Sequence, residues 1–378
     1  MRRRVAIPLL IVQPTSFCNL DCRYCYVPNR EVNDRLPGAD LRLILENINL
    51  ALGDEFELQW HAGEPLTAGK SFYRQANATI RAFEASRGVR VHQSLQTNGT
   101  LIDDEWCEIF NEFEIGIGVS IDGPQPLHDL NRRARSGRGT HQSVMRGIDL
   151  LRRHGRNPAA LSVVTLETIR NAELWFNFFV DNGFDRLGFN IEEIENANFA
   201  TSFGQSNTYD AQFRAFIEET FALYLRNQEK IDVREYRNVV QILQEIRKNK
   251  DFRRTPEEAK KGQISTVDRL GNVYPYSPEF AGIYAPAFNG FTIGNLKNDS
   301  LNDIFKSEAA ARIDDAISRS VERCRSECAY FQLCGGVFFS NKFAEHGHLY
   351  GTETGTCRRS VKIMFDAVIG LLETQQLA

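Results

Sequence analysis

Three closely spaced cysteines near the start of the chain constrain its fold and chemistry more than any other feature. Cys18, Cys22 and Cys25 form a C-x3-C-x2-C motif directly after the apolar run of residues 5–12. A fully ligated [4Fe–4S] cluster takes four cysteines, so three would leave one iron open to a small-molecule ligand. The spacing also allows a three-cysteine zinc site without a nearby fourth ligand, or plain buried thiols. The motif predicts a metal centre, with iron–sulfur as the leading interpretation.

The distribution of all eight cysteines indicates a reducing compartment. Three lie near the start of the chain, four near the end, and Cys107, an expected core residue, stands alone between them. A chain of 378 residues needs no disulfide staples, so the clusters indicate metal ligation in the cytoplasm. No stretch approaches the roughly 20 apolar residues of a membrane span. The net charge of -4 gives no positive field that would attract nucleic acid. We expect a soluble protein with neither membrane nor nucleic-acid partners.

Short β-rich runs alternate with helical patterns over the first half of the chain. The runs are Val5–Val12, Phe56–Trp60, Val89–Leu95, Ile115–Ile121, Leu161–Leu166 and Leu187–Ile191. Between the first two, Leu41, Ile44, Ile48 and Leu52 repeat at helical spacing behind Asp40, a candidate N-cap. Strands separated by helices predict βαβ units and a parallel sheet. The sequence therefore predicts an α/β fold with a partial (βα)6 barrel.

Polar motifs follow the predicted strands where each strand ends. They are His61–Leu66 (HAGEPL), Gln96–Thr100 (QTNGT) and Ser120–Pro124 (SIDGP). Each motif alone is ordinary turn chemistry. In a barrel of parallel strands, however, the loops at the carboxyl ends form the active site. Their joint placement with the cysteine loop predicts one site.

The cysteine motif, with Tyr24 before its third cysteine, resembles the signature of radical S-adenosylmethionine (SAM) enzymes over residues 5–195. The resemblance implies that the three-cysteine [4Fe–4S] cluster binds SAM. It implies SAM-pocket roles for Tyr24, Ala62, Gly63, Glu64, Pro65, Gln96, Thr97, Asn98, Ser120, Asp122 and Arg132. Ala62 stands where the family's Gly-Gly-Glu-Pro motif begins with glycine. Glu64 is expected on the SAM ammonium and Arg132 on the SAM carboxylate, although Arg133 and Arg135 are neighbours.

A run of carboxylates follows the sixth predicted strand. The sequence Phe189–Glu195 (FNIEEIE) places them at the mouth of the barrel. Acidic residues that begin a loop are usually solvated and inert. A carboxylate here would instead take a proton from a substrate radical or bind a peptide amine. Glu192 and Glu193 are the catalytic candidates.

The second half of the chain changes in character. A polar stretch after Asn196 without periodicity predicts a linker, and the helical patterns that follow predict bridging helices. Ile264–Tyr276 predicts a hairpin that turns at Gly271 and Asn272. We expect a barrel over residues 1–196, a bridge over 197–260 and a small domain over 261–378.

Four cysteines near the end, Cys324, Cys328, Cys334 and Cys357, are enough to close a metal site. Their spacing allows structural zinc or a fully ligated [4Fe–4S] cluster. The hairpin, the segment Ile293–Leu296 and this series resemble the SPASM domain of radical SAM peptide-modifying enzymes, which favours iron–sulfur. A full SPASM domain holds two auxiliary clusters. Tyr276 or Ser277 and Phe338 stand at ligand positions of one of them, so we expect one auxiliary cluster.

The combined resemblance implies a radical SAM peptide maturase that acts on a ribosomally made precursor. The context of residues 60–66 and 189–195 is similar to maturases that join an aromatic ring to a side-chain β-carbon, which forms a cyclophane. One alternative is an anaerobic sulfatase-maturing type, which makes formylglycine from cysteine or serine; another is an iron–sulfur electron-transfer or sensor protein that does not cleave SAM. Implied partners are the precursor peptide and a reductant such as flavodoxin or ferredoxin. Because the first strand begins so early, a separate protein or the barrel and bridge would bind the leader.

Overall fold

Parallel strands in chain order build the first half of the protein, as their alternation with helices predicts. The computed structural model describes residues 8–48, 50–204 and 206–376. The strands are β1 (Leu9–Val12), β2 (Glu55–Trp60), β3 (Arg90–Thr97), β4 (Gly116–Ser120), β5 (Ala159–Val164) and β6 (Arg186–Ile191). Each pairs in parallel with the next. Predicted strand residues 5–7 lie outside the described ranges.

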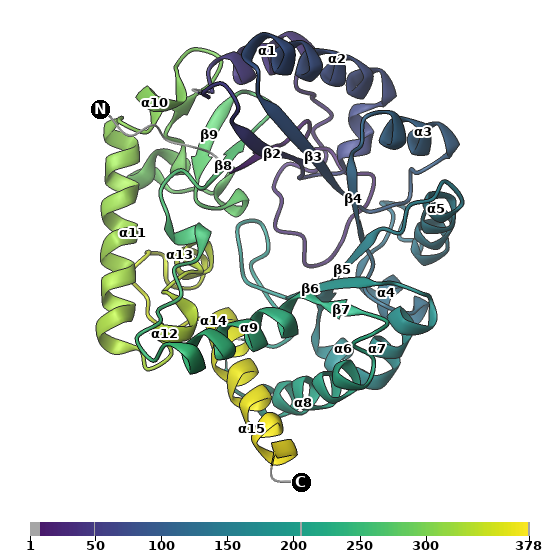
Figure 1. The fold of residues 1–378 in the computed structure, drawn as a ribbon, viewed down its shortest axis with the longest axis vertical. Coiled ribbons are helices and arrows are strands. Elements are labelled where there is room, and N and C mark those ends of the chain that lie inside the picture. The colour runs from purple at the N-terminus through teal and green to yellow at the C-terminus, as the bar shows by residue number, and fades with distance from the viewer. Residues whose placement is uncertain (1–7, 49, 205, 377–378) are drawn as a thin grey trace.

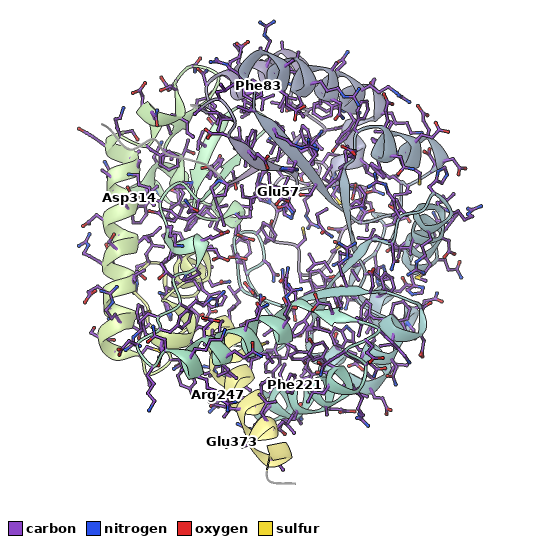
Figure 2. The ribbon with its side chains drawn as sticks, viewed as in Figure 1. Glu57, Phe83, Phe221, Arg247, Asp314 and Glu373 are labelled. Atoms are coloured by element: carbon purple, nitrogen blue, oxygen red, sulfur yellow. The ribbon has the colours of Figure 1, made fainter. Side chains whose placement is uncertain are left out.

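Helices between these strands cover the outer side of the curved sheet (Figure 1). They are α1 (Gly38–Glu46), α2 (Lys70–Arg87), α3 (Asp104–Glu112), α4 (Gln125–Asn131), α5 (His141–Arg153), α6 (Leu166–Ile169) and α7 (Ala172–Asp181). Cys107 on α3 is fully buried in the core, as expected. Phe83 on α2 is 6% exposed and belongs to the same apolar layer (Figure 2).

The sheet continues past the predicted barrel at both edges. β7 (Asp232–Val233) pairs with β6, and β8 (Ile264–Val267) pairs in parallel with β1. β9 (Asn272–Pro275) returns antiparallel to β8, which confirms the predicted hairpin, and β10 (Gly294–Asn295) follows it. Gly271 has a φ of +88° at the turn, a conformation that favours glycine. One ten-stranded sheet, in the order β10-β9-β8-β1-β2-β3-β4-β5-β6-β7, thus joins the two halves of the chain.

The remaining helices complete the ring around the sheet. They are α8 (Asp210–Arg226), α9 (Arg234–Lys248), α10 (Leu301–Ile304), α11 (Glu308–Glu327), α12 (Phe331–Cys334), α13 (Phe339–His346), α14 (Gly355–Cys357) and α15 (Met364–Gln376). The three phenylalanines of α8, Phe213, Phe216 and Phe221, belong to the core, and Phe221 is fully buried (Figure 2). The expected domain boundaries and cytoplasmic location stay predictions. Among the helices described, none has the length and apolar character to cross a membrane.

Three local predictions were wrong. Asp40 was the candidate N-cap of the first helix, but that helix begins at Gly38 behind Pro37, and Asp40 lies in its first turn. Leu166 was assigned to the fifth strand, but β5 ends at Val164 and Thr165 caps α6 through a capping box. The first helix ends at Glu46, well before Leu52, which is 86% exposed. Its cap residue Asn47 bonds to the C-terminal half: its amide donates to the Leu296 carbonyl at 2.7 Å. This tertiary contact ends the helix where the local pattern would continue it.

Candidate active site

The cysteine loop and the three polar motifs face a common cavity of about 660 Å³. The thiols of Cys18, Cys22 and Cys25 line one end of it. Most of the predicted SAM-pocket residues line the same cavity: Tyr24, Ala62, Gly63, Gln96, Thr97, Asn98, Ser120 and Arg132. The other three, Glu64, Pro65 and Asp122, are buried beside it. The carboxyl ends of the strands therefore bring the predicted motifs together.

The Ala62–Pro65 motif packs directly against the backbone that leads into Cys18. Gly63 has a φ of +57°, and a Cβ atom there would lie 2.5 Å from the Phe17 carbonyl oxygen. Only glycine fits this close approach without a shift of the backbone. On the other side, the Asn98 amide lies 3.9 Å from the Cys18 sulfur. The loops after β2 and β3 thus set the shape of the cysteine loop.

The Glu64 carboxylate connects the loop after β2 to the loop after β3 through hydrogen bonds. Its fully buried carboxylate accepts from the Leu66 N–H at 3.0 Å, the Thr97 hydroxyl at 2.7 Å and the Asn98 N–H at 2.7 Å. Burial raises the pKa of Glu64 to about 7, although these three donors oppose the shift. The geometry favours a positioning role over the direct contact with the SAM ammonium that the sequence predicts.

Asp122 and Arg132 form an ion pair in the cavity wall. The Arg132 Nε lies 3.0 Å from the Asp122 carboxylate, which also accepts from the Val163 N–H at 2.9 Å and from the Tyr24 hydroxyl. The guanidinium lies over the Tyr24 ring, 5.4 Å from its centroid. Burial lowers the pKa of Arg132, but Asp122 and Tyr24 outweigh it, so Arg132 stays charged. Asp122 therefore holds Arg132 in place.

The neighbouring arginines are engaged elsewhere. The Arg133 Nε donates to the Asp129 carbonyl at 2.9 Å, and the Arg135 Nε donates to the Cys18 carbonyl at 2.9 Å. Arg132 lines the cavity beside the cysteine thiols. This arrangement supports Arg132 as the residue for the SAM carboxylate.

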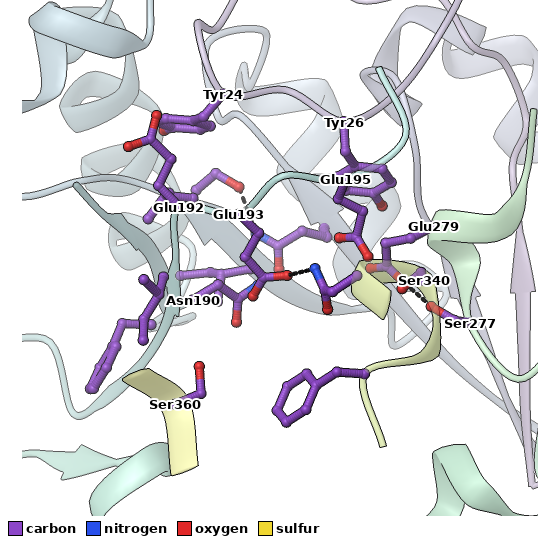
Figure 3. A pocket seen from close by; sticks show the side chains of 18 of the residues that line it. Tyr24, Tyr26, Asn190, Glu192, Glu193, Glu195, Ser277, Glu279, Ser340 and Ser360 are labelled. Carbon is purple, nitrogen blue, oxygen red and sulfur yellow. Dashed lines mark hydrogen bonds between the residues drawn. The ribbon is translucent and has the colours of Figure 1, made fainter. Parts of the chain in front are cut away.

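Three carboxylates of the cavity lining lie close together, as Figure 3 shows for Glu193, Glu195 and Glu279. The Asn341 amide donates to the Glu193 carboxylate at 2.6 Å, and the Ser277 hydroxyl donates to Glu279. Burial raises the pKa of Glu193 to about 8. Burial and, after it, the neighbouring carboxylates raise the pKa of Glu195 as well. A carboxyl group with the pKa of Glu193 can hold or release a proton close to neutral pH.

The two catalytic candidates differ in their surroundings. Glu192 points away from the cluster of Glu193, Glu195 and Glu279 (Figure 3), and its carboxylate accepts from the Ser202 N–H at 2.9 Å. Sequence reasoning placed Glu195 in the acidic run at the barrel mouth without selecting it as a candidate, and it missed Glu279. The two-residue period of an extended chain would have placed Glu193 and Glu195 on one side. No motif marks Glu279.

The positions of the missing cluster ligands are filled by other side chains. Tyr276 is 3% exposed, has a φ of +69°, and its hydroxyl donates to Asp314 at 2.7 Å. Phe338, with a φ of +69°, and Ser277 line the cavity near Glu279. These side chains offer no thiolate, and the number of auxiliary clusters stays a prediction.

The four C-terminal cysteines line a second, smaller pocket together. Burial raises the pKa of Cys357 to about 12, and it also raises that of Cys334. In the described part of the chain, no three His, Cys, Asp or Glu side chains lie close enough to hold a single metal ion. The ligand sets of both clusters therefore stay predictions, which the two cavities support.

Comparison with known proteins identifies the family. The radical SAM superfamily matches residues 12–173. An uncharacterized protein of Synechocystis sp. is 37% identical over 370 residues, which cover 97% of this chain and 92% of that protein. The chain belongs to the radical SAM superfamily. A cysteine-type anaerobic sulfatase-maturating enzyme of Clostridium perfringens is 25% identical over 348 residues, covering 87% of this chain and 88% of the relative.

A solved structure shares the fold of this radical SAM enzyme. It is native anSMEcpe with bound AdoMet and a Cp18Cys peptide, at a TM-score of 0.78 and 21% identity, covering 97% of this chain and 98% of that one. As a member of the radical SAM superfamily, the protein uses SAM and [4Fe–4S] clusters as its cofactors. The cavity fits them: burial raises the pKa of the Cys22 thiol to about 12, so the thiolate forms with metal ligation. Arg132 offers a cation for a carboxylate.

Proposed function

We propose that this radical SAM enzyme modifies a peptide or protein substrate at a side-chain β-carbon, with oxidation of cysteine or serine to formylglycine as the leading outcome. The observation that carries this proposal is the single cavity, which joins the thiols of Cys18, Cys22 and Cys25 to the carboxylates of Glu193 and Glu279. The sulfatase-maturating relatives support this outcome over the cyclophane that the sequence favours.

Bound SAM, once cleaved reductively, supplies a carbon radical that removes hydrogen from an unactivated C–H bond. Oxidation of a serine CH₂–OH group to an aldehyde removes one hydrogen atom, one electron and one proton. We assign the proton to Glu193, whose carboxylate faces the cavity and is held by Asn341. A base of this kind works best when its pKa is close to the working pH. The electron must pass to a one-electron acceptor outside the peptide, and we assign this role to an oxidised [4Fe–4S] cluster at the four C-terminal cysteines.

A cyclophane crosslink is the second candidate, and the replaced ligand positions favour it. Tyr276, Ser277 and Phe338 stand where the resemblance implies a further cluster, which sulfatase-maturing enzymes keep. Crosslinking also begins at a β-carbon, and once that carbon has bonded to the aromatic ring, the ring must lose one electron and one proton. The same cavity and the same base would serve both reactions. A reductant such as flavodoxin or ferredoxin and a separate leader-binding protein stay predictions.

Reconstituted protein should distinguish these reactions under anaerobic conditions. Reduced enzyme and SAM are incubated with a peptide that carries cysteine or serine, and separately with one that carries an aromatic residue near an aliphatic side chain. We expect 5′-deoxyadenosine in both reactions, and a product that reacts with a hydroxylamine aldehyde probe from the first peptide. An aldehyde-free product that has lost a pair of hydrogens, with fragment ions joined across the ring, would favour the crosslink.

The matched control replaces Cys18, Cys22 and Cys25 with alanine and should form no 5′-deoxyadenosine. Wild-type protein with full iron that cleaves no SAM under any of these conditions would contradict the enzyme proposal. That result would favour the electron-transfer or sensor class.

A further inference from the structure

A buried lysine lies against one of the four cysteines of the C-terminal pocket. Lys342, on α13, is 2% exposed. Its ammonium donates to the Ser320 hydroxyl at 2.9 Å, to the Gly336 carbonyl at 3.1 Å and to the Cys324 sulfur at 3.2 Å. An ammonium group has three protons to donate, so these partners account for all of them.

None of these three partners carries a permanent negative charge. A charged group in a protein interior is strongly unfavourable unless an anion compensates it. The Ser320 hydroxyl and the Gly336 carbonyl are neutral, whereas the Cys324 sulfur becomes an anion as the thiolate that binds metals. The other three cysteines line the same pocket as Lys342. The arrangement indicates that the counter-ion of Lys342 is a thiolate-ligated centre.

We propose that Lys342 is a positioning residue that holds the Cys324 thiolate and raises the reduction potential of the auxiliary cluster. This inference rests on the proposed assignment of the four cysteines to a [4Fe–4S] cluster. Reduction adds one electron and therefore one negative charge, and no bond forms or breaks. The Lys342 charge and its hydrogen bond to sulfur both stabilise the more negative state, because hydrogen bonds to sulfur and net charge set the potential of such clusters.

A second lysine, Lys362, lies close enough to Cys328 and Cys357 to interact with them electrostatically and provides a matched control. The Lys362 ammonium pairs with the Glu353 carboxylate, and its side chain is 26% exposed. Its charge is already compensated by a carboxylate and partly screened by water. Removal of Lys362 should therefore change the potential less than removal of Lys342.

The test is an EPR-monitored redox titration of the reconstituted full chain. The variants are Lys342→Met, Lys342→Arg and Lys362→Met, and the auxiliary signal is identified as the one that added SAM does not perturb. We expect Lys342→Met to lower the midpoint potential of the auxiliary cluster by at least about 59 mV. For one electron, this shift is a tenfold decrease in the equilibrium constant for reduction. Lys342→Arg keeps the charge, so it and Lys362→Met should each shift the midpoint by less than half as much.

The iron content of each variant distinguishes a counter-ion role of Lys342 from a packing role. Loss of the auxiliary iron in Lys342→Met, with retention in Lys342→Arg, would also support a counter-ion. An unchanged midpoint in fully loaded Lys342→Met would overturn the proposal, and iron loss in both variants would overturn it in favour of a packing role. Wild-type protein with clearly fewer than about eight irons would instead show that the cluster assignment itself is wrong. Neither the midpoint potential nor the iron content depends on peptide modification, so this test is independent of the proposed reaction.

Discussion

The ion pair between Asp122 and Arg132 offers the sharpest test of how the cavity wall is built. The two residues are 1% and 7% exposed. Their separation of 3.0 Å corresponds to about 5.5 kcal/mol of attraction at an effective dielectric constant of about 20. Desolvation offsets much of that attraction. Removal of one partner still costs about 3–5 kcal/mol, because the remaining charge is buried and uncompensated.

Asp122→Asn keeps the shape of the side chain and removes its charge. The amide oxygen can still accept from the Val163 N–H, so we expect the lower end of that range, a loss of about 3 kcal/mol. An unfolding entropy of about 2.1 cal/mol/K per residue over 378 residues converts this loss to a midpoint about 4 °C lower. Differential scanning calorimetry of the anaerobic protein measures the midpoint. We also expect SAM to bind about tenfold more weakly, because Arg132 loses its anchor.

Asp149→Asn is the control, since Asp149 is exposed on α5 and its replacement should change neither quantity. An unchanged midpoint in Asp122→Asn would refute the reasoning about the buried pair. A lower midpoint with unchanged SAM affinity would keep the pair but contradict the assignment of Arg132 to the SAM carboxylate.

Three further predictions address the clusters, the base and the loop. Alanine at Cys18, Cys22 and Cys25 should abolish 5′-deoxyadenosine and leave about half of the iron; continued SAM cleavage would exclude this loop as the SAM site. Because the pKa of Glu193 is raised to about 8, its base form grows with pH, so turnover should rise between about pH 7 and pH 9 and stay flat in Glu193→Gln. Gly63→Ala should lose iron from the first cluster, because its Cβ would meet the Phe17 carbonyl oxygen at 2.5 Å; Ala62→Gly, at a φ of +72°, should retain it.

Most of the fold was predictable from local sequence periodicity. The parallel strands and the hairpin were predictable because each rests on alternation or turn chemistry within a short stretch. The end of α1 was not, since Asn47 bonds to a carbonyl almost 250 positions away. The pairing of β8 with β1 was hidden for the same reason. Only the folded chain brings such partners together.

The candidate site divides in the same way. The SAM-side residues follow strand ends, so a barrel places them together once the strands are known. Glu193 was found because it follows β6, whereas its partner Asn341 lies 148 positions further along the chain. Glu64 was found as a residue, and its contact with the SAM ammonium stays a prediction. The hydrogen bonds that its carboxylate accepts from Thr97 and Asn98 were not predictable, because these donors belong to the loop after the next strand. A motif identifies the residue, and the contacts of the folded chain define what its atoms do.

The neutral side chains at the missing ligand positions affect the pKa values of the carboxyl groups that line the same cavity. A [4Fe–4S] cluster with four thiolates carries net negative charge, and a nearby anion raises the pKa of a carboxyl group. Glu193, Glu195 and Glu279 already have raised pKa values from burial. A cluster at Tyr276 and Phe338, which border the same cavity, would raise those values further, so that Glu193 would reach its base form only above its present pKa of about 8. We infer that the neutral side chains at the ligand positions keep the base form of Glu193 accessible at a lower pH than a cluster there would allow.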